Sequence, residues 1–137
     1  MSLVPTTAQS MTVHPAFAKT DVTSLISLDI SGAGVLPSVV ESCEAAFKVP
    51  AGTSYGMTES PSTLIWPIRE GSVLRNGEVL SGRPSRGARV KICEPGTTKM
   101  VPRGVAGELH NGGVQIITEY MDPVSYTHLT LPTILRV

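Results

Sequence analysis

Apolar side chains recur every three or four residues between positions 36 and 48, which predicts an amphipathic α-helix there. The apolar face of this helix carries Val39, Val40, Cys43, Ala46 and Phe47. The opposite face is charged, and Glu44 and Lys48 stand four residues apart, so they can pair along the helix. Pro37 suits the first helical turn, and Pro50 prevents the helix from continuing.

The residues before this helix predict another helix followed by a buried strand. Pro5 suits the first turn of a helix over residues 5–18, and Pro15 is expected to end or kink it. Residues 24–30, SLISLDI, form an apolar run of strand length. After the second helix, the segment GTSYG at residues 52–56 predicts a strand that runs into a loop.

The pattern changes at residue 61, where short apolar or alternating runs replace the helical repeat. These runs are TLIW, GEVL, ARVKI, GELH and VQIIT. Turn signals separate them, and Asn76-Gly77 favours a hairpin turn because both residues tolerate positive φ. The predicted fold class is α/β. A layered α/β subdomain over residues 1–60 is followed by a β-rich subdomain over residues 61–123, a small β-barrel or antiparallel sheet.

Composition narrows the functional classes. Hydrophobic residues make up 41% of the 137 residues, which is enough for a core. The 11 Lys and Arg residues balance 11 Asp and Glu residues, so charge gives no reason to expect a nucleic-acid partner. No apolar run approaches the roughly 20 residues that span a bilayer, and the N-terminus lacks signal-peptide features. No transmembrane segment is therefore expected.

The two cysteines, Cys43 and Cys93, are too few for a disulfide framework. They also form no metal-ligand pattern with His14, His110 or His128. We expect two reduced and partly buried thiols, which is typical of a reducing, cytoplasmic compartment.

The last stretch of the chain, residues 124–137, is expected to be non-native. It begins VSYTHLTLPT, which looks like the in-frame translation of a transposon-end adapter used in sequencing libraries. The string follows Asp122-Pro123 abruptly and fits neither a helix nor a clean strand continuation. We therefore exclude this tail from functional interpretation. The natural continuation after residue 123 is expected to be missing.

The segment SYGMTES at residues 54–60 resembles the Y-G-x-T-E motif of the adenylate-forming superfamily. That superfamily includes acyl-CoA synthetases, aryl-CoA ligases, luciferases and the adenylation domains of nonribosomal peptide synthetases. Other segments resemble the family in the same order: LVPT at 3–6, SGAGVLP at 31–37, SGRP at 81–84, VKI at 90–92, GVAGEL at 104–109 and the segment 112–120. These ordered matches over residues 3–123 resemble an interior piece of the large N-terminal domain of such enzymes.

The resemblance implies roles for particular residues. Tyr55 is expected at adenine, Thr58 at a phosphate, and Glu59 at Mg²⁺. The backbone of Gly32, Ala33 and Gly34 is expected along the nucleotide and the acyl pocket. Met57 is the residue expected to touch the acyl group.

These residue types suit chemistry at a phosphate. Activation of a carboxylic acid requires attack on the negatively charged α-phosphate of ATP, which needs hydrogen-bond donors and a metal around it. Thr58 offers a hydroxyl donor and Glu59 a hard oxygen ligand for Mg²⁺. Gly56 allows close approach of the backbone, and Tyr55 offers a flat face for adenine.

The function implied by the resemblance is that of an acid–thiol ligase, with fatty-acid metabolism as its expected context. Such an enzyme uses ATP and Mg²⁺ to convert a small-molecule carboxylic acid into an acyl-adenylate, and then into a thioester of CoA. One alternative is an adenylation domain that loads a carrier-protein thiol. Another is a truncated, non-catalytic nucleotide-binding module.

Three parts of the family's machinery are expected outside residues 1–123. They are the Ser/Thr/Gly-rich phosphate loop, the ribose-binding Asp and the C-terminal domain with its catalytic Lys. Because positioning supplies much of such catalysis, the isolated chain is expected to be inactive.

Simpler interpretations apply to several of these residues when the family context is ignored. Residues 58–61 then form an ordinary loop or capping sequence, and Gly32 and Gly34 form a plain turn. Arg89 and Lys91 are expected to be solvated charges on a strand face. Trp66 is expected to pack in the core.

Overall fold

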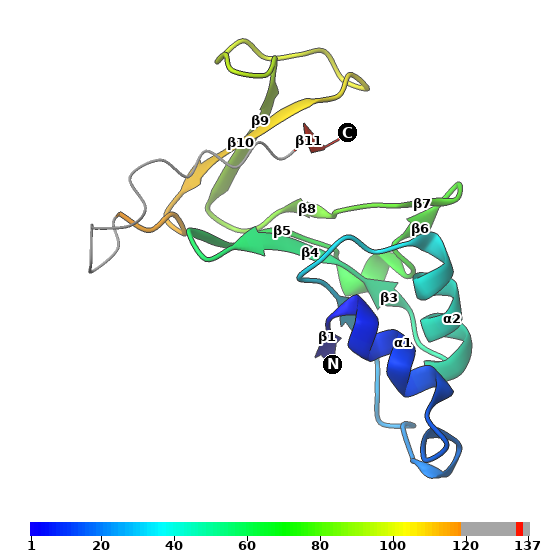
Figure 1. Cartoon of the computed structure of the whole chain (residues 1–137). Coiled ribbons are helices and arrows are strands. Elements are labelled where there is room, and N and C mark those ends of the chain that lie inside the picture. Colours follow the sequence, from blue (N-terminus) through cyan, green and yellow to red (C-terminus); the bar gives the residue numbers. More distant parts are fainter. Residues whose placement is uncertain (119–133, 136–137) are drawn as a thin grey trace.

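The computed structural model describes residues 1–118 and 134–135, so most of the predicted non-native tail lies outside the described residues. Its first elements, shown in Figure 1, are β1 (Ser2–Leu3), α1 (Pro5–Val13), the 3₁₀ helix η1 (Phe17–Lys19), β2 (Leu28–Ile30), α2 (Pro37–Phe47) and β3 (Ala51–Gly52). The three strands form a parallel sheet in the order β1-β2-β3. We call this sheet with α1 and α2 the α/β layer.

The predicted helix over residues 36–48 is confirmed as α2, which begins at Pro37 and ends at Phe47. Four of its five predicted apolar residues, all except the half-buried Ala46, are buried in the core. Lys48 ends the helix in a left-handed conformation with φ of 59°. The predicted Glu44–Lys48 pair is not among the ion pairs of the described residues. Glu44 Oε1 instead accepts a hydrogen bond of 2.8 Å from the Ala51 backbone N–H, joining α2 to β3.

Two predicted elements are shorter than expected. The predicted helix over residues 5–18 ends at Val13, and η1 follows after Pro15, which confirms that Pro15 interrupts the helix. The predicted strand over residues 24–30 is reduced to β2, because its partners β1 and β3 are each only two residues long. Backbone pairing therefore ends where the neighbouring strands end.

The remaining elements confirm the predicted change to β structure. They are β4 (Ser54–Met57), β5 (Ser60–Ile65), η2 (Ile68–Glu70), β6 (Leu74–Arg75), β7 (Glu78–Val79), β8 (Arg83–Pro84), β9 (Ala88–Cys93), β10 (Gly107–Gly113) and β11 (Ile134–Leu135). They form three antiparallel sheets, β4-β5-β8, β6-β7 and β11-β10-β9. The Asn76-Gly77 hairpin is confirmed, since both residues have positive φ between β6 and β7.

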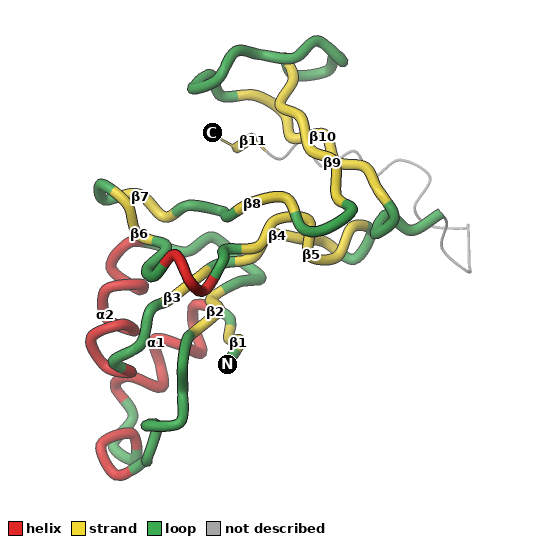
Figure 2. Tube along the Cα trace, turned by 180° about the vertical axis from the view of Figure 1, so that it is seen from behind, coloured by secondary structure: helices red, strands yellow, loops and turns green. Residues whose placement is uncertain are grey.

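Of the two forms predicted for the β-rich part, the antiparallel sheet is confirmed, and no closed barrel forms in the part of the chain that the structure describes. The three antiparallel sheets are separate, and the pair β9–β10 extends away from the helices in both Figure 1 and Figure 2. Closure of a barrel requires each strand to pair on both sides, and these short sheets end instead in open edges. The sheet β4-β5-β8 crosses the predicted boundary at residue 60, and the division into subdomains stays a prediction.

The core lies mainly in the α/β layer. Its buried side chains come from α1, β2, α2 and β3, with Trp66 and Val73 added from the β-rich part. Trp66 donates a hydrogen bond of 2.8 Å from Nε1 to the Gly71 carbonyl, which confirms its predicted packing role. Cys43 and Cys93 are both free and buried. Among the described residues, no helix has the length and apolar character needed to cross a membrane.

Candidate functional site

A cavity of about 380 Å³ lies where the α/β layer meets the sheet β4-β5-β8. It has three walls, which Figure 1 allows the reader to trace as the loop between β2 and α2, strand β4, and the segment that follows β7. The lining residues are Ile30, Gly32, Ala33, Gly34, Val35, Thr53, Ser54, Tyr55, Gly56, Val79, Leu80 and Ser81. We call this space the central cavity.

Five of the eight predicted site residues line the central cavity: Gly32, Ala33, Gly34, Tyr55 and Gly56. The structure thus brings residues 32–34 and residues 55–56 to one cavity, although they are about 20 residues apart in sequence. Both segments were predicted to bind the nucleotide. Tyr55 is half-buried, and an open space lies beside it.

The other three predicted residues, Met57, Thr58 and Glu59, do not line this cavity. They lie at the turn between β4 and β5, where Thr58 is exposed and the other two are half-buried. The Glu59 carbonyl accepts a hydrogen bond of 3.0 Å from the Ile117 backbone N–H, which ties this turn to the segment after β10. Their assigned roles stay predictions.

The backbone gives two of the glycines structural reasons of their own. Gly32 has φ of +85°, in the region that favours glycine, so it allows the chain to turn after β2. A Cβ at Gly56 would lie 2.5 Å from the Ser62 backbone nitrogen, so glycine permits the close approach of β5 to β4. Close contact between the two strands therefore explains why residue 56 is a glycine, and the expected close approach of a ligand is not needed to explain it.

The third wall was not anticipated from the sequence. Thr53 Oγ1 donates a hydrogen bond of 2.7 Å to the Leu80 carbonyl, which links the segment after β7 to the residue between β3 and β4. Val79, Leu80 and Ser81 thereby face the glycine turn. In the sequence, Val79 and Leu80 belong to an ordinary strand pattern. The only signal in this region was the neighbouring segment SGRP at 81–84, which resembles the family.

A second unanticipated feature is the carboxylate of Asp29, in the middle of β2. Its Oδ2 atom accepts hydrogen bonds from three serine hydroxyls, at 2.8 Å from Ser2, 2.9 Å from Ser31 and 3.2 Å from Ser54. Ser31 directly precedes Gly32, and Ser54 itself lines the cavity. The signal in the sequence was a single acidic residue inside the apolar run SLISLDI.

The chemistry of the lining favours an uncharged ligand group. No Asp, Glu, Lys, Arg or His is among the lining residues, and Tyr55 contributes the single aromatic ring. Such a surface suits a flat, partly apolar group with a few hydrogen-bonding atoms. Phosphate groups need cations or several donors, and this neutral cavity has no cationic side chain among its lining residues.

The described residues contain no group of three or more His, Cys, Asp or Glu side chains that could hold a metal ion. Glu59 is half-buried at the β4–β5 turn. Mg²⁺ is commonly held by one or two carboxylates together with substrate phosphates and water. The predicted magnesium role of Glu59 is compatible with this mode of binding and stays a prediction.

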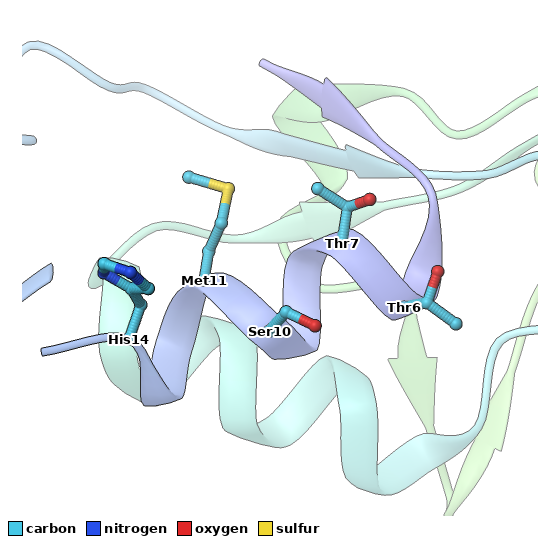
Figure 3. Close-up of a pocket in the computed structure, with 5 residues that line it drawn as sticks. All are labelled: Thr6, Thr7, Ser10, Met11 and His14. Atoms are coloured by element: carbon cyan, nitrogen blue, oxygen red, sulfur yellow. The ribbon is translucent and has the colours of Figure 1, made fainter.

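A second hollow of about 280 Å³ lies on α1, as Figure 3 shows. Its lining residues are Thr6, Thr7, Ser10, Met11 and His14, all on or directly after one helix. It contains none of the predicted site residues. His14 Nδ1 accepts a hydrogen bond of 3.1 Å from the Ala16 backbone N–H, so that nitrogen has a structural role at the helix end.

Known proteins resemble this chain over most of its length. A family model described as "AMP-binding enzyme" matches residues 1–121. An acyl–CoA ligase from Pestalotiopsis microspora is 27% identical over 124 residues, which cover 87% of this chain and 21% of that protein. 4-Coumarate–CoA ligase 1 from Petroselinum crispum is 30% identical over 134 residues, which cover 93% of this chain and 24% of that protein. The chain therefore spans about a fifth to a quarter of the length of these two relatives.

Solved structures show the same fold. An anthranilate CoA ligase in complex with anthranoyl-AMP matches with a TM-score of 0.70 and 20% identity, over 84% of this chain and 21% of that one. The ATP-bound MatB from Rhodopseudomonas palustris matches with a TM-score of 0.72 and 21% identity, over 87% of this chain and 23% of that one.

Proposed function

Because this chain belongs to the AMP-binding enzyme family, we propose that it forms part of the nucleotide site of an ATP-dependent acid–thiol ligase. In the proposed reaction a carboxylate oxygen attacks the α-phosphorus of ATP, which releases pyrophosphate and leaves an acyl-adenylate. The thiol of CoA then attacks the acyl carbon, and AMP leaves. The relatives named as CoA ligases support this choice of thiol over a carrier protein.

The observation that carries the proposal is the central cavity. It places the turn at Gly32–Gly34 opposite Tyr55, around a neutral space that suits a purine base. An aromatic ring on one side and a glycine-containing backbone on the other would hold a flat base between them. The base would then be fixed by stacking and by backbone hydrogen-bonding groups, as in other sequence-tolerant base sites.

The β4–β5 turn would receive the charged part of the nucleotide. Thr58 is exposed there and would donate its hydroxyl hydrogen to a phosphate oxygen. Glu59 would hold Mg²⁺, whose charge offsets that of the phosphates. The neutral cavity and the polar turn would therefore divide the nucleotide between base and phosphates.

The adenine role is tested by titrating the chain with AMP and with ATP and Mg²⁺ in a calorimeter. Tyr55→Ala is expected to weaken AMP binding by about 5- to 150-fold, since stacking on an aromatic ring contributes about 1–3 kcal/mol per base. Tyr55→Phe keeps the ring and is the matched control, expected to retain most of the affinity. Equal affinity of the wild type and Tyr55→Ala would exclude stacking on this ring.

The metal role is tested by pyrophosphate exchange in the complete enzyme that carries this segment. Glu59→Ala is expected to abolish most of the exchange, whereas Glu41→Ala, on the exposed face of α2, is the control. Exchange that survives Glu59→Ala unchanged would remove Glu59 from the metal site. Absence of any adenylate formation by the unsubstituted enzyme would leave the second alternative, a non-catalytic nucleotide-binding module.

A further inference from the structure

The carboxylate of Asp29 connects two walls of the central cavity without lining the cavity itself. Its Oδ2 atom lies 2.9 Å from Ser31 Oγ and 3.2 Å from Ser54 Oγ. Ser31 is the residue before Gly32, and Ser54 is the residue before Tyr55. One carboxylate oxygen therefore accepts hydrogen bonds from the residue before Gly32 in one wall and from the residue before Tyr55 in the other.

The position of this carboxylate is set by the α/β layer. Asp29 lies in β2, the central strand, and is paired with Ser2 on one side and Gly52 on the other. Its backbone N–H donates a hydrogen bond of 2.8 Å to the Met1 carbonyl. Because β2 has neighbours on both sides, the side chain starts from a well-constrained backbone. The third hydroxyl, from Ser2 at 2.8 Å, further limits the rotation of the carboxylate.

Each wall also has backbone bonds of its own. Ser31 donates its backbone N–H to the Leu3 carbonyl at 3.0 Å, and Ser54 and Tyr55 pair with Ile65 and Leu64 of β5. The turn after Ser31 contains Gly32 and Gly34, and a Cβ at Gly34 would have no heavy atom within 4 Å, so the turn is loosely packed there. Tyr55 lies next to a register shift in the pairing of β4 with β5. Hydrogen bonds to a charged acceptor are about twice as strong as those between neutral groups. The Asp29 carboxylate therefore joins the two segments to each other, in addition to the bonds that each segment makes separately.

We propose that Asp29 is a positioning residue that sets the distance between the Gly32–Gly34 turn and Tyr55 through the hydroxyls of Ser31 and Ser54. The ligand part of this inference rests on the proposed function, because the space between the walls is the proposed base site. The geometric part stands independently, since it concerns the coupling of two segments in the ligand-free chain.

The geometric part is tested by ¹H–¹⁵N NMR of the ligand-free chain. Asp29→Ala is expected to move the amide signals of Gly32, Gly34, Tyr55 and Gly56 together. Asp29→Asn retains one oxygen acceptor and is expected to give smaller shifts at the same positions. The matched control is Asp21→Ala, which also removes a carboxylate that accepts bonds from a hydroxyl and a backbone N–H, both of Thr23.

Two further variants keep the test decisive if Asp29→Ala does not fold, which Trp66 fluorescence would reveal. Ser31→Ala is expected to disturb Tyr55 across the cavity, and Ser54→Ala is expected to disturb Gly32, since both act through Asp29. Shifts confined to the wall that carries each substitution would overturn the proposal. So would Asp29→Ala shifts that affect one wall alone.

The ligand part is tested by AMP affinity, measured in the same calorimeter. Asp29→Ala is expected to weaken AMP binding about tenfold, and Asp29→Asn less. Adding Ser31→Ala and Ser54→Ala to Asp29→Ala is expected to cause no further loss, because the shared acceptor is already gone. Fully additive losses would contradict a common action through Asp29. If the wild-type chain binds no AMP, the proposed base site fails in this chain, while the NMR measurement still decides the positioning role.

Discussion

The α/β layer and the ribbon formed by β9 and β10 are both well-paired parts of this chain, but different forces hold them. The layer packs two helices on its parallel sheet and contains most of the buried apolar side chains. The ribbon has a continuous ladder from Cys93 and Glu108 to Ala88 and Gly113, yet Cys93 is its only buried large side chain among the described residues. Backbone pairing thus accounts for the ribbon, whereas side-chain burial accounts for the layer.

This difference matters for the central cavity, because no residue of the ribbon is among the residues that line it. A two-stranded ribbon is marginally stable in water when little apolar area is buried, and the third strand, β11, pairs with only two residues of β10. Arg89 and Lys91 are exposed on one of its faces, as predicted, and Val90 and Ile92 on the other are half-buried. Local opening is therefore expected to begin in the ribbon, and the glycine turn and Tyr55 are expected to stay in place while it opens.

The largest expected effect comes from emptying the core of the layer. Phe47 is 2% exposed, and its ring contacts that of Phe17 edge to face with centroids 4.8 Å apart. Phe47→Ala is expected to lower the free energy of unfolding by about 3–5 kcal/mol, measured by urea denaturation followed through Trp66 fluorescence. Val90→Ala in the ribbon is the control and is expected to cost much less. Equal losses would mean that the two regions do not differ in packing.

The next effect separates backbone strain from steric overlap. Gly82 and Gly77 both have positive φ, +88° and +80°, but a Cβ at Gly82 would lie 2.4 Å from the Ile65 backbone and one at Gly77 would meet nothing within 4 Å. Alanine at either position costs about 1–2 kcal/mol for the left-handed backbone. Overlap is expected to add about 1–3 kcal/mol at Gly82 alone.

Equal denaturation midpoints for Gly82→Ala and Gly77→Ala would show that the junction between β5 and the segment at Gly82 can relax. In that case the packing of the β4-β5-β8 sheet would be closer to that of the ribbon than to that of the layer. The cavity wall that leads to Ser81 would then be less firmly held.

A smaller effect compares the two thiols, one in each region. Cys43 in α2 and Cys93 in β9 are both 0% exposed, so reaction with iodoacetamide requires opening of the structure. Cys93 is expected to react about tenfold faster or more, which corresponds to an opening free energy lower by about 1.4 kcal/mol. Mass spectrometry of tryptic peptides measures the two rates. Faster reaction at Cys43 would reverse the proposed order of stability.

The smallest effect is a pH dependence confined to the layer. Burial, and secondarily the nearby Glu44 charge, raises the pKa of the Cys43 thiol above its usual range. The folded state therefore keeps the proton that the unfolded state loses, and the contribution to stability is complete below the unfolded pKa of about 8.5. It is lost as the pH rises through that value toward the higher folded pKa.

Urea denaturation at pH 7 and at pH 9.5 measures this effect, and Cys43→Ala provides the reference. The wild type is expected to lose more stability between the two pH values than Cys43→Ala does. An identical loss in both proteins would show that the Cys43 thiol does not contribute to the alkaline decline.

Local patterns in the sequence predicted several features correctly. The apolar face of α2 follows from spacing of three and four residues, and the hairpin at Asn76-Gly77 follows from the φ preferences of those two residues. The Y-G-x-T-E resemblance at residues 54–60 led to the family that the comparisons support. Each of these features depends on residues that are close in the chain, so short windows of sequence contain the relevant information.

The errors arose where a feature depends on distant partners. The strand predicted over residues 24–30 is cut to Leu28–Ile30 by the short strands beside it. The sequence left open whether the β-rich part is a barrel or an antiparallel sheet. The described residues form antiparallel sheets, because closure depends on which strands meet at the sheet edges. Glu44 accepts a hydrogen bond from the Ala51 backbone rather than pairing with Lys48, because the chain passes back beside Glu44 after the helix ends.

The sequence alone therefore determined the family, the α2 helix and the identity of the residues that we assign to the nucleotide. Only the tertiary structure decided that Leu80 faces the glycine turn and that Asp29 bonds to Ser31 and Ser54. The physical reason is that a hydrogen bond or a cavity wall needs two segments at one place in space. Position along the chain does not specify which segments come together, and this is decided only when the sheets and helices pack.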